Sequence, residues 1–229
     1  MKIFKIFCTL LIMSIPTFLS AQDWANLNRY REENLKLNTS DSTQTRIVFF
    51  GNSITEGWPK LSPAFFQNET YINRGIGGQT TPQFLVRFRA DVINLKPKVV
   101  LILGGTNDIA GNTGPSTLEM IADNLFSMAE IAKANDIQVV LCSVLPVFDY
   151  SWKPGLEPAN KIIQLNKMIK NYADSHGIVY LDYFTATVDE RNGMKKIYSE
   201  DGVHPNAAGY KVMEPLAQKA IAEALKKKD

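Results

Sequence analysis

Short apolar runs alternate with longer amphipathic segments along most of the chain. Runs of strand length, mostly apolar, occur at residues 46–50, 70–73, 99–103, 137–145 and 178–181. Apolar residues at a spacing of three and four predict helices at residues 23–37, 82–95, 116–134, 158–175 and 206–227. A polar stretch at residues 38–45 separates the first helix from the first strand.

This order of elements predicts the fold class. Strands that are apolar on both faces and alternate with helices are typical of a parallel sheet covered by helices on each side. The chain has 229 residues and contains neither an internal repeat nor a low-complexity linker. We therefore expect one α/β domain at residues 22–229, a three-layer α/β/α sandwich. In such a domain, ligands bind beyond the carboxyl ends of the strands.

The first 21 residues have the pattern of a secretory signal peptide. Lys2 and Lys5 precede an apolar run at residues 6–19, and Ala21 provides a small residue at the expected cleavage site. A transmembrane anchor is the alternative, but this run is short against the ~20 residues that a bilayer requires. Cys8 lacks the small preceding residues of a lipid-attachment site. We expect export to the periplasm or the extracellular space, with no stable membrane anchor.

Charge and cysteine content narrow the range of functions. The chain has 25 Lys+Arg and 23 Asp+Glu, and loss of Lys2 and Lys5 with the signal peptide leaves 23 of each. Nucleic acid is not an expected partner, because no excess positive charge is available for a phosphate backbone. Cys142 would be the one remaining cysteine, which predicts a buried thiol and no internal disulfide. With two histidines and no cofactor motif, we expect neither a metal site nor a cofactor.

The first predicted strand is followed by a candidate nucleophile. Residues 51–55 read GNSIT, so a glycine-led turn would present Ser53 at the edge of the sheet. The amides of a following helix would then point at the group that Ser53 attacks. A serine in such a turn is also commonly a helix cap, so this turn alone is weak evidence.

The next two strands are followed by candidate hydrogen-bond donors. Residues 73–81 read NRGIGGQTT, and their glycines leave backbone N–H groups unshielded, although the loop could simply turn the chain. After the third strand, Asn107 could direct a side-chain amide toward Ser53, because neighbouring parallel strands end side by side. Such a neutral donor is suited to an oxyanion. Alternatively, Asn107 or Asp108 satisfies loop amides.

A candidate base precedes the last predicted helix. Asp201 lies three residues before His204, close enough for its carboxylate to reach one imidazole nitrogen. This pairing would select the tautomer and leave the other nitrogen free to take a proton from a serine. The second histidine, His176, fits a basic helix C-terminus instead. Asp182, after the fifth strand, is a second candidate for the acid.

Taken together, these segments resemble the SGNH hydrolases, also called the GDSL esterase/lipase family. They are most similar to the branch with platelet-activating-factor acetylhydrolase-like enzymes, in the family's own order from about residue 47 to 210. The resemblance implies a flavodoxin-like five-stranded sheet and a Ser53 nucleophile. It also implies an oxyanion hole formed by Ser53, Gly78 and Asn107, with Asp201 and His204 as acid and base.

One position departs from the family pattern. Asn52 stands where the family has an aspartate before the nucleophile. Asparagine keeps the size and an acceptor oxygen, so it can stabilise the turn, whereas any role of the negative charge is lost. We interpret Asn52 as a variation within a subgroup of the family.

The resemblance implies a two-step acyl transfer to water, with activity rising with pH as His204 becomes neutral. The candidate substrate contacts are Trp58, Arg74 and two residues of an aromatic loop after the fourth strand, Tyr150 and Trp152. These side chains could instead pack on the domain or, for Arg74, form a structural ion pair. No long hydrophobic lid is apparent.

We expect short-acyl esters as the substrate, with acetyl esters on a carbohydrate as the leading candidate. A short-chain lipid esterase or thioesterase and an O-acyltransferase are the alternatives, because they use the same triad. A non-catalytic ligand-binding domain is less favoured, since the nucleophile, base and oxyanion donors are all present.

Overall fold

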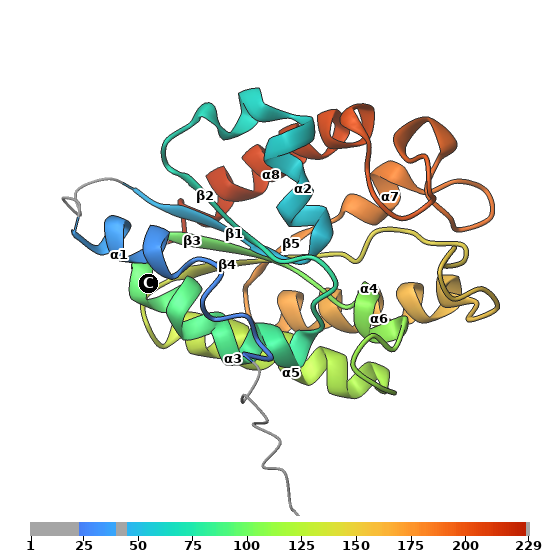
Figure 1. Ribbon diagram of the computed structural model, residues 1–229, viewed down its shortest axis with the longest axis horizontal. Coiled ribbons are helices and arrows are strands. Elements are labelled where there is room, and N and C mark those ends of the chain that lie inside the picture. The colour runs from blue at the N-terminus through green and yellow to red at the C-terminus, as the bar shows by residue number, and fades with distance from the viewer. Residues whose placement is uncertain (1–22, 40–44, 228–229) are drawn as a thin grey trace, which may run out of the picture.

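The computed structural model describes residues 23–39 and 45–227. The expected signal peptide at 1–21 lies outside these ranges. The described strands form one parallel five-stranded sheet in the order β2-β1-β3-β4-β5 (Figure 1), which confirms the predicted flavodoxin-like fold. The strands are β1 (Ile47–Gly51), β2 (Tyr71–Gly75), β3 (Val99–Leu103), β4 (Gln138–Cys142) and β5 (Val179–Leu181).

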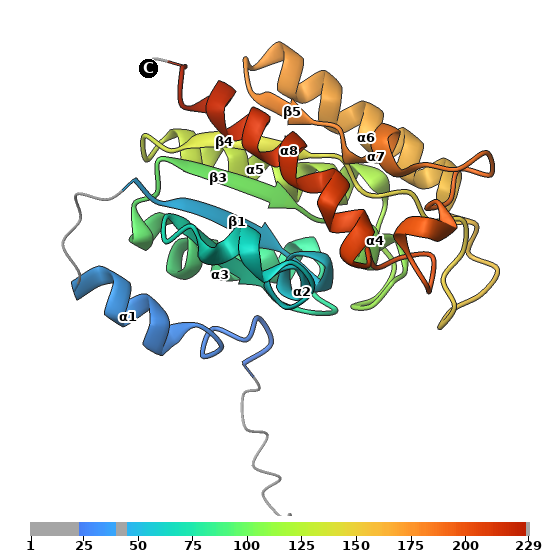
Figure 2. The same ribbon diagram turned by 90° about the horizontal axis from the view of Figure 1, so that it is seen from above.

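Helices cover both faces of the sheet (Figures 1 and 2). One face carries α3 (Thr81–Asp91), α5 (Leu118–Lys133) and α6 (Pro158–Ser175). The other carries α2 (Ser53–Leu61), α7 (Tyr183–Thr187) and α8 (Ala207–Ala224). Outside these layers, α1 (Arg31–Thr39) packs against α3, and α4 (Thr106–Ile109) directly follows β3. Single turns of 3-10 helix lie at η1 (Pro63–Gln67), η2 (Ile93–Leu95) and η3 (Lys196–Tyr198).

The uniform hydrophobicity of the strands follows from these three layers. Every residue of β1 and β3 is buried. Alternate residues of β1 enter different hydrophobic clusters: Val48 and Phe50 join the cluster with α3 and α5, whereas Phe49 joins the cluster with α2 and α8. A strand that is buried on both faces has no polar side to show, as the sequence pattern predicted.

Most predicted elements differ from the observed ones at their ends, and the first helix and the fourth strand show why. The first helix begins at Arg31 rather than at residue 23, because residues 24–30 form turns with Asn26 in the left-handed region at φ 55°. The fourth strand ends at Cys142 rather than at residue 145. There the Asn166 side chain of α6 replaces the sheet partner, accepting a hydrogen bond from Val144 N and donating one to Val144 O.

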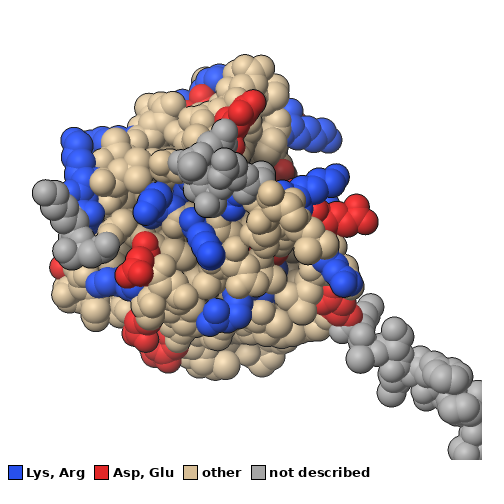
Figure 3. All heavy atoms as spheres, turned by 90° about the vertical axis from the view of Figure 1, so that its left-hand side faces the viewer, with Lys and Arg blue, Asp and Glu red and all other residues tan. Residues whose placement is uncertain are grey.

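The topology places a ligand site at the carboxyl ends of β1 and β3, where the strand order reverses direction. The carboxyl ends of the strands lie on the side of the molecule opposite to the face shown in Figure 3. On that face, acidic and basic side chains are interspersed. None of the helices within the described ranges combines the length and hydrophobicity that crossing a bilayer requires. The buried Cys142 thiol agrees with the expectation from the sequence.

Candidate active site

Three of the predicted residues form a hydrogen-bonded chain beyond the carboxyl end of β1. Ser53 Oγ lies 2.9 Å from His204 Nε2. On the other side of the ring, His204 Nδ1 lies 2.7 Å from Asp201 Oδ2. These are the distances and the order of groups that a serine nucleophile, a histidine base and an orienting carboxylate require. The segments that supply them are about 150 residues apart in sequence, as Ser53 and His204 show.

The β1–α2 turn fixes Ser53 at the first position of α2. Asn52 is the N-cap of this helix, and its Oδ1 accepts a hydrogen bond from Ile54 N at 3.0 Å. Asn52 is buried, so the asparagine in place of the family aspartate retains the acceptor function that the turn uses. Gly51 is required here, because a Cβ would lie 2.1 Å from Thr55 Oγ1.

Asp201 is held as an anion by the loop that also carries His204. Its Oδ1 accepts hydrogen bonds from the backbone N–H groups of Val203 at 2.9 Å and His204 at 2.8 Å. Burial alone would raise the pKa of Asp201, but hydrogen bonds from the His204 side chain and these two N–H groups outweigh it and lower the pKa to about 2. The second candidate acid, Asp182, instead caps α7 by accepting from Thr185 N.

The glycine loop after β2 lies against the nucleophile. A Cβ on Gly77 would be 3.7 Å from Ser53 Cβ, so the two backbones approach closely. Gly78 has φ +74°, in the region that favours glycine, and a Cβ there would meet nothing within 4 Å. The loop is therefore open toward solvent at Gly78, the position from which an N–H donor was expected.

Asn107 lies at the start of α4, just beyond β3, and its side chain is buried. Its Nδ2 donates a hydrogen bond to Gln79 O at 2.9 Å, which ties α4 to the glycine loop. A primary amide has two N–H groups, so a second donor remains on Nδ2. Asp108, beside it, accepts from both the backbone N–H and the hydroxyl of Thr81, as the alternative reading of this loop expected.

Arg87 is an organising residue that the sequence analysis missed. Its buried guanidinium donates to Gly51 O and Arg74 O at 2.9 Å each, and to Gln79 Oε1 at 2.6 Å. It also forms a buried ion pair with Asp91 at 3.0 Å. Arg87 thus joins the ends of β1 and β2 and the glycine loop. The i,i+4 spacing of Arg87 and Asp91 on a predicted helix was the available signal, but it does not indicate burial.

Three of the four candidate substrate contacts are buried, which contradicts their expected role. Trp58 is 1% exposed and stacks on Phe65 in the core. Arg74 is 2% exposed, and its Nε donates to Asn34 Oδ1 of α1. Tyr150 is fully buried. Each of these residues is near a motif in sequence. Neighbouring residues can nevertheless point in opposite directions, so a residue close to an exposed motif can have its side chain in the core.

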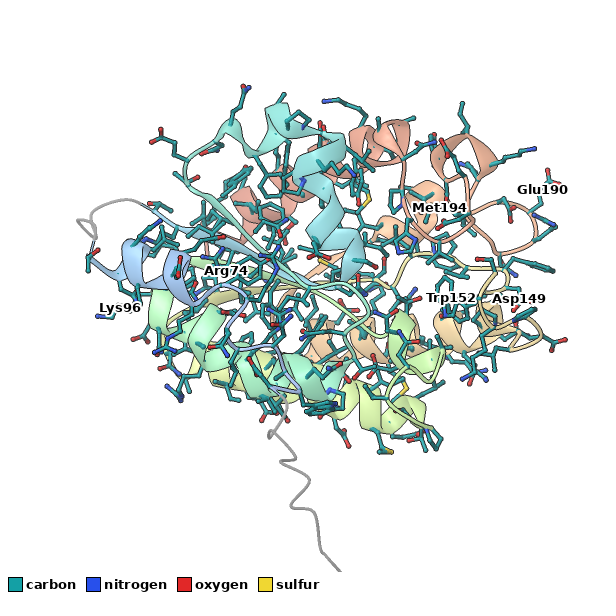
Figure 4. The ribbon with its side chains drawn as sticks, viewed as in Figure 1. Arg74, Lys96, Asp149, Trp152, Glu190 and Met194 are labelled. Carbon is teal, nitrogen blue, oxygen red and sulfur yellow. The ribbon has the colours of Figure 1, made fainter. Side chains whose placement is uncertain are left out.

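Trp152 is the candidate that does lie at the site. Its side chain is 46% exposed, and its ring centroid is 6.4 Å from that of His204. Figure 4 shows Trp152 in the loop after β4, far from Arg74 beside α1. Buried Tyr150 anchors this loop, because its hydroxyl donates to Thr106 O at 2.8 Å. Burial also raises the pKa of Tyr150 to about 12, so the hydroxyl keeps its proton.

Within the described residues, no group of three or more His, Cys, Asp or Glu side chains is arranged to hold a metal ion.

Comparisons with known proteins agree with this geometry. The model of the GDSL-like lipase/acylhydrolase family matches residues 49–212. A GDSL-like lipase from Bacteroides thetaiotaomicron VPI-5482 is 46% identical, covering 87% of this chain and 98% of that one with a TM-score of 0.84. A structure from Streptococcus pneumonia whose description names platelet activating factor is 26% identical, covering 84% and 91% with a TM-score of 0.71.

Two curated relatives also match. Esterase TesA of Pseudomonas aeruginosa is 27% identical over 191 residues, which span 76% of this chain and 86% of that protein. The lipoprotein YqeF of Bacillus subtilis is 32% identical over 127 residues, and this match spans only about half of the relative, 52% of its length. The matched residues 49–212 include the whole Ser53, His204 and Asp201 chain. The chain therefore belongs to the GDSL-like lipase/acylhydrolase family of carboxylic ester hydrolases.

Proposed function

We propose that this protein is an exported serine esterase that hydrolyses short-acyl esters, with acetyl groups on a carbohydrate as its substrate. The observation that carries the proposal is the unbroken chain from Ser53 Oγ through His204 to Asp201, with contacts of 2.9 and 2.7 Å. Family membership supports ester hydrolysis as the reaction class.

The mechanism begins with proton transfer. With its Nδ1–H donated to Asp201, His204 has a free lone pair on Nε2 and takes the Ser53 proton as Oγ attacks the ester carbonyl. The ionised Asp201 stabilises the imidazolium that forms. His204 then protonates the leaving alkoxide, and later takes a proton from the water that hydrolyses the acyl-enzyme.

The negative charge that develops on the carbonyl oxygen needs donors that are already in position. The proposed donors are the backbone N–H groups of Ser53 and Gly78 and the remaining amide N–H of Asn107. The helix start at Ser53 supports this assignment, because the first N–H groups of α2 have no partner inside the helix. The open space at Gly78 supports it on the loop side.

Trp152 supports a carbohydrate as the group that carries the ester. An exposed indole beside the catalytic base offers a flat apolar face and one N–H donor, which suits a sugar ring better than an extended acyl chain. Lipid esters, thioesters and acyl transfer to a second alcohol remain chemically compatible with the same three residues. A purely ligand-binding domain would not need the Ser53–His204 contact.

The proposal is tested by hydrolysis of 4-nitrophenyl acetate, butyrate and octanoate. We expect turnover that falls with acyl length, is abolished in Ser53→Ala and is unchanged in Ser127→Ala, a control serine on α5. Equal rates for the wild type and Ser53→Ala on all three esters would refute the esterase. Adding xylose or glycerol as an acceptor distinguishes hydrolysis from transfer, since a transferase would form the acetylated acceptor in place of acetate.

The role of Trp152 is tested on the carbohydrate itself. For an acetylated xylooligosaccharide, we expect Trp152→Ala to raise KM by about 10-fold, the scale of one lost aromatic contact of about 1–1.5 kcal/mol. The change for 4-nitrophenyl acetate should be smaller, because that substrate has no sugar to bind. Trp24→Ala, at another exposed tryptophan, is the control. Equal KM changes on both substrates would show that Trp152 does not bind the sugar.

Export and cleavage near Ala21 are part of the proposal. Intact-mass measurement of the protein released from cells should give a chain that begins at residue 22. The relative YqeF is named a lipoprotein, and a lipid attached at Cys8 is the alternative. That alternative would appear in the same measurement as a longer chain with added acyl mass.

A further inference from the structure

Glu56 connects the helix of the nucleophile with the glycine loop. It lies three residues after Ser53 on α2, and its Oε2 accepts a hydrogen bond from Gly77 N at 2.8 Å. A Cβ on Gly77 would lie 2.9 Å from the same oxygen and 3.7 Å from Ser53 Cβ. The carboxylate therefore holds the loop at the point where the loop meets the nucleophile.

The next residue along the loop, Gly78, is held from its other side. Gly78 O accepts a hydrogen bond from Asn112 Nδ2 at 3.1 Å. The peptide unit that carries Gly78 N–H thus lies between two restrained points, Gly77 N and Gly78 O. Two adjacent glycines are conformationally permissive, and both residues here are exposed, so packing does not fix this peptide unit. Its orientation depends on the two hydrogen bonds.

We propose that Glu56 is a positioning residue that orients the Gly78 N–H toward the oxyanion. This inference rests on the proposed esterase function. In this role Glu56 acts through the backbone of Gly77 and not directly on the reacting atoms. Its effect is on the transition state, because the Gly78 N–H stabilises charge that develops only there.

The useful property of Glu56 is its acceptor oxygen and not its charge. A negative charge near a developing oxyanion is unfavourable, and Arg29 Nη2 lies 3.6 Å from Glu56 Oε1, where it offsets that charge. Both side chains of this pair are partly exposed to solvent, so the pair contributes little to stability. Glutamine keeps an acceptor oxygen at the same reach, and it should therefore replace Glu56.

The kinetic test compares Glu56→Ala and Glu56→Gln on 4-nitrophenyl acetate. We expect Glu56→Ala to lower kcat by about 10- to 100-fold, less than the ~10²–10³-fold cost of removing an oxyanion donor outright. KM should stay within about twofold, because the lost interaction is made only in the transition state. Glu56→Gln should restore kcat to within about threefold of wild type. Glu223→Ala, an exposed glutamate at the end of α8, is the matched control.

A second measurement follows the loop itself and needs no turnover. In amide NMR spectra, the Gly77 N–H should shift and exchange faster with solvent in Glu56→Ala, and should return toward its wild-type behaviour in Glu56→Gln. Unchanged Gly77 signals in Glu56→Ala would overturn the proposal, whatever the activity.

Failure of the proposed esterase function and failure of the positioning role of Glu56 give different results. Wild-type protein without turnover on any ester refutes the proposed function, while the Gly77 signals still decide whether Glu56 holds the loop. Active wild type with Glu56→Ala equal to it in kcat overturns the positioning role alone. A rise in KM with unchanged kcat also overturns it, as does Glu56→Gln being as slow as Glu56→Ala.

Discussion

The second amide N–H of Asn107 has a defined purpose in the proposed mechanism. One N–H of Asn107 Nδ2 donates a hydrogen bond to Gln79 O. This bond prevents free rotation of the side chain, so the other N–H has a fixed direction. Asn107→Ala should lower kcat by about 10²–10³-fold, or about 2.7–4 kcal/mol, with little change in KM.

Stability provides the control for this variant. Loss of the bond to Gln79 O should reduce the free energy of unfolding by about 0.5–1.5 kcal/mol, measured by urea denaturation. A loss of unfolding free energy as large as the loss of transition-state stabilisation, with kcat unchanged in the folded fraction, would make Asn107 a structural residue only.

Asp201 and His204 make a prediction about pH. The pKa of Asp201 is lowered to about 2, so this carboxylate is already ionised above about pH 4. Any rise of activity with pH should therefore follow a limb of slope one, because Asp201 adds no second ionisation over that range. The measurement is log kcat/KM against pH from 4 to 9; a slope of two would show that Asp201 also takes up a proton in this range.

The lowered pKa of Asp201 also determines how its contribution to the free energy of unfolding depends on pH. Because the folded pKa of Asp201 is below its ordinary value near 3.9, the ionised group contributes stability above about pH 4 and loses it as the pH falls toward 2. The difference in unfolding free energy between wild type and Asp201→Asn should shrink over that window. The group is partly exposed, so the difference should be small throughout.

At the scale of elements, α3 fastens the strand ends through Arg87. Four of its contacts, to Gly51, Arg74, Gln79 and Asp91, are buried. Arg87→Met should reduce the free energy of unfolding by about 3–5 kcal/mol, because it leaves Asp91 as an unpaired buried charge. Arg89→Met, at an exposed position of the same helix, should change it by less than about 0.5 kcal/mol. Similar losses in both variants, measured by denaturant unfolding, would contradict the network.

The sequence predicted the elements well where burial alone determines them. β1 and β3 are buried on both faces, so every position is apolar and the pattern is unambiguous. The structure also brings Ser53, His204 and Asp201 into contact, as the sequence predicted, because Ser53 follows the end of β1 and the other two lie in the loop before α8. Trp58, Arg74 and Tyr150 were misplaced, since proximity in sequence does not say toward which side of a loop or helix a side chain points.

The sequence also failed to predict structure that depends on contacts between distant segments. The helical spacing of the apolar residues at 23–30 hides the turns that Asp23, Asn26 and Asn28 form, and these turns also have partners in the glycine loop and α3. Gln79 Nε2 donates to Ala25 O at 2.8 Å, Gln83 Nε2 donates to Trp24 O at 2.6 Å, and the Tyr30 hydroxyl donates to Gly75 O. A helical spacing in this segment was overridden by these tertiary hydrogen bonds.

At the scale of the whole molecule, this N-terminal segment packs against the loop beside the candidate active site. Its contacts reach the β2 end and the loop that holds Gly77 and Gly78, and they start only a few residues after the proposed cleavage point. A chain that begins at residue 31 should therefore be less stable than one that begins at residue 23, by roughly 2–4 kcal/mol for three lost hydrogen bonds and the exposed Gln79 amide. It should also have a lower kcat, since the glycine loop loses its outer support.

Denaturant unfolding of the two chains, with 4-nitrophenyl acetate turnover measured on each, checks this prediction. Tyr30→Phe in the longer chain isolates one of the three contacts and should cost about 1 kcal/mol, because it removes only the hydroxyl that donates to Gly75 O. If the chain from residue 31 matched the longer one in both stability and kcat, residues 23–30 would contribute neither to the fold nor to the site. A loss of stability with unchanged kcat would limit their role to the fold and separate it from the orientation of the oxyanion loop.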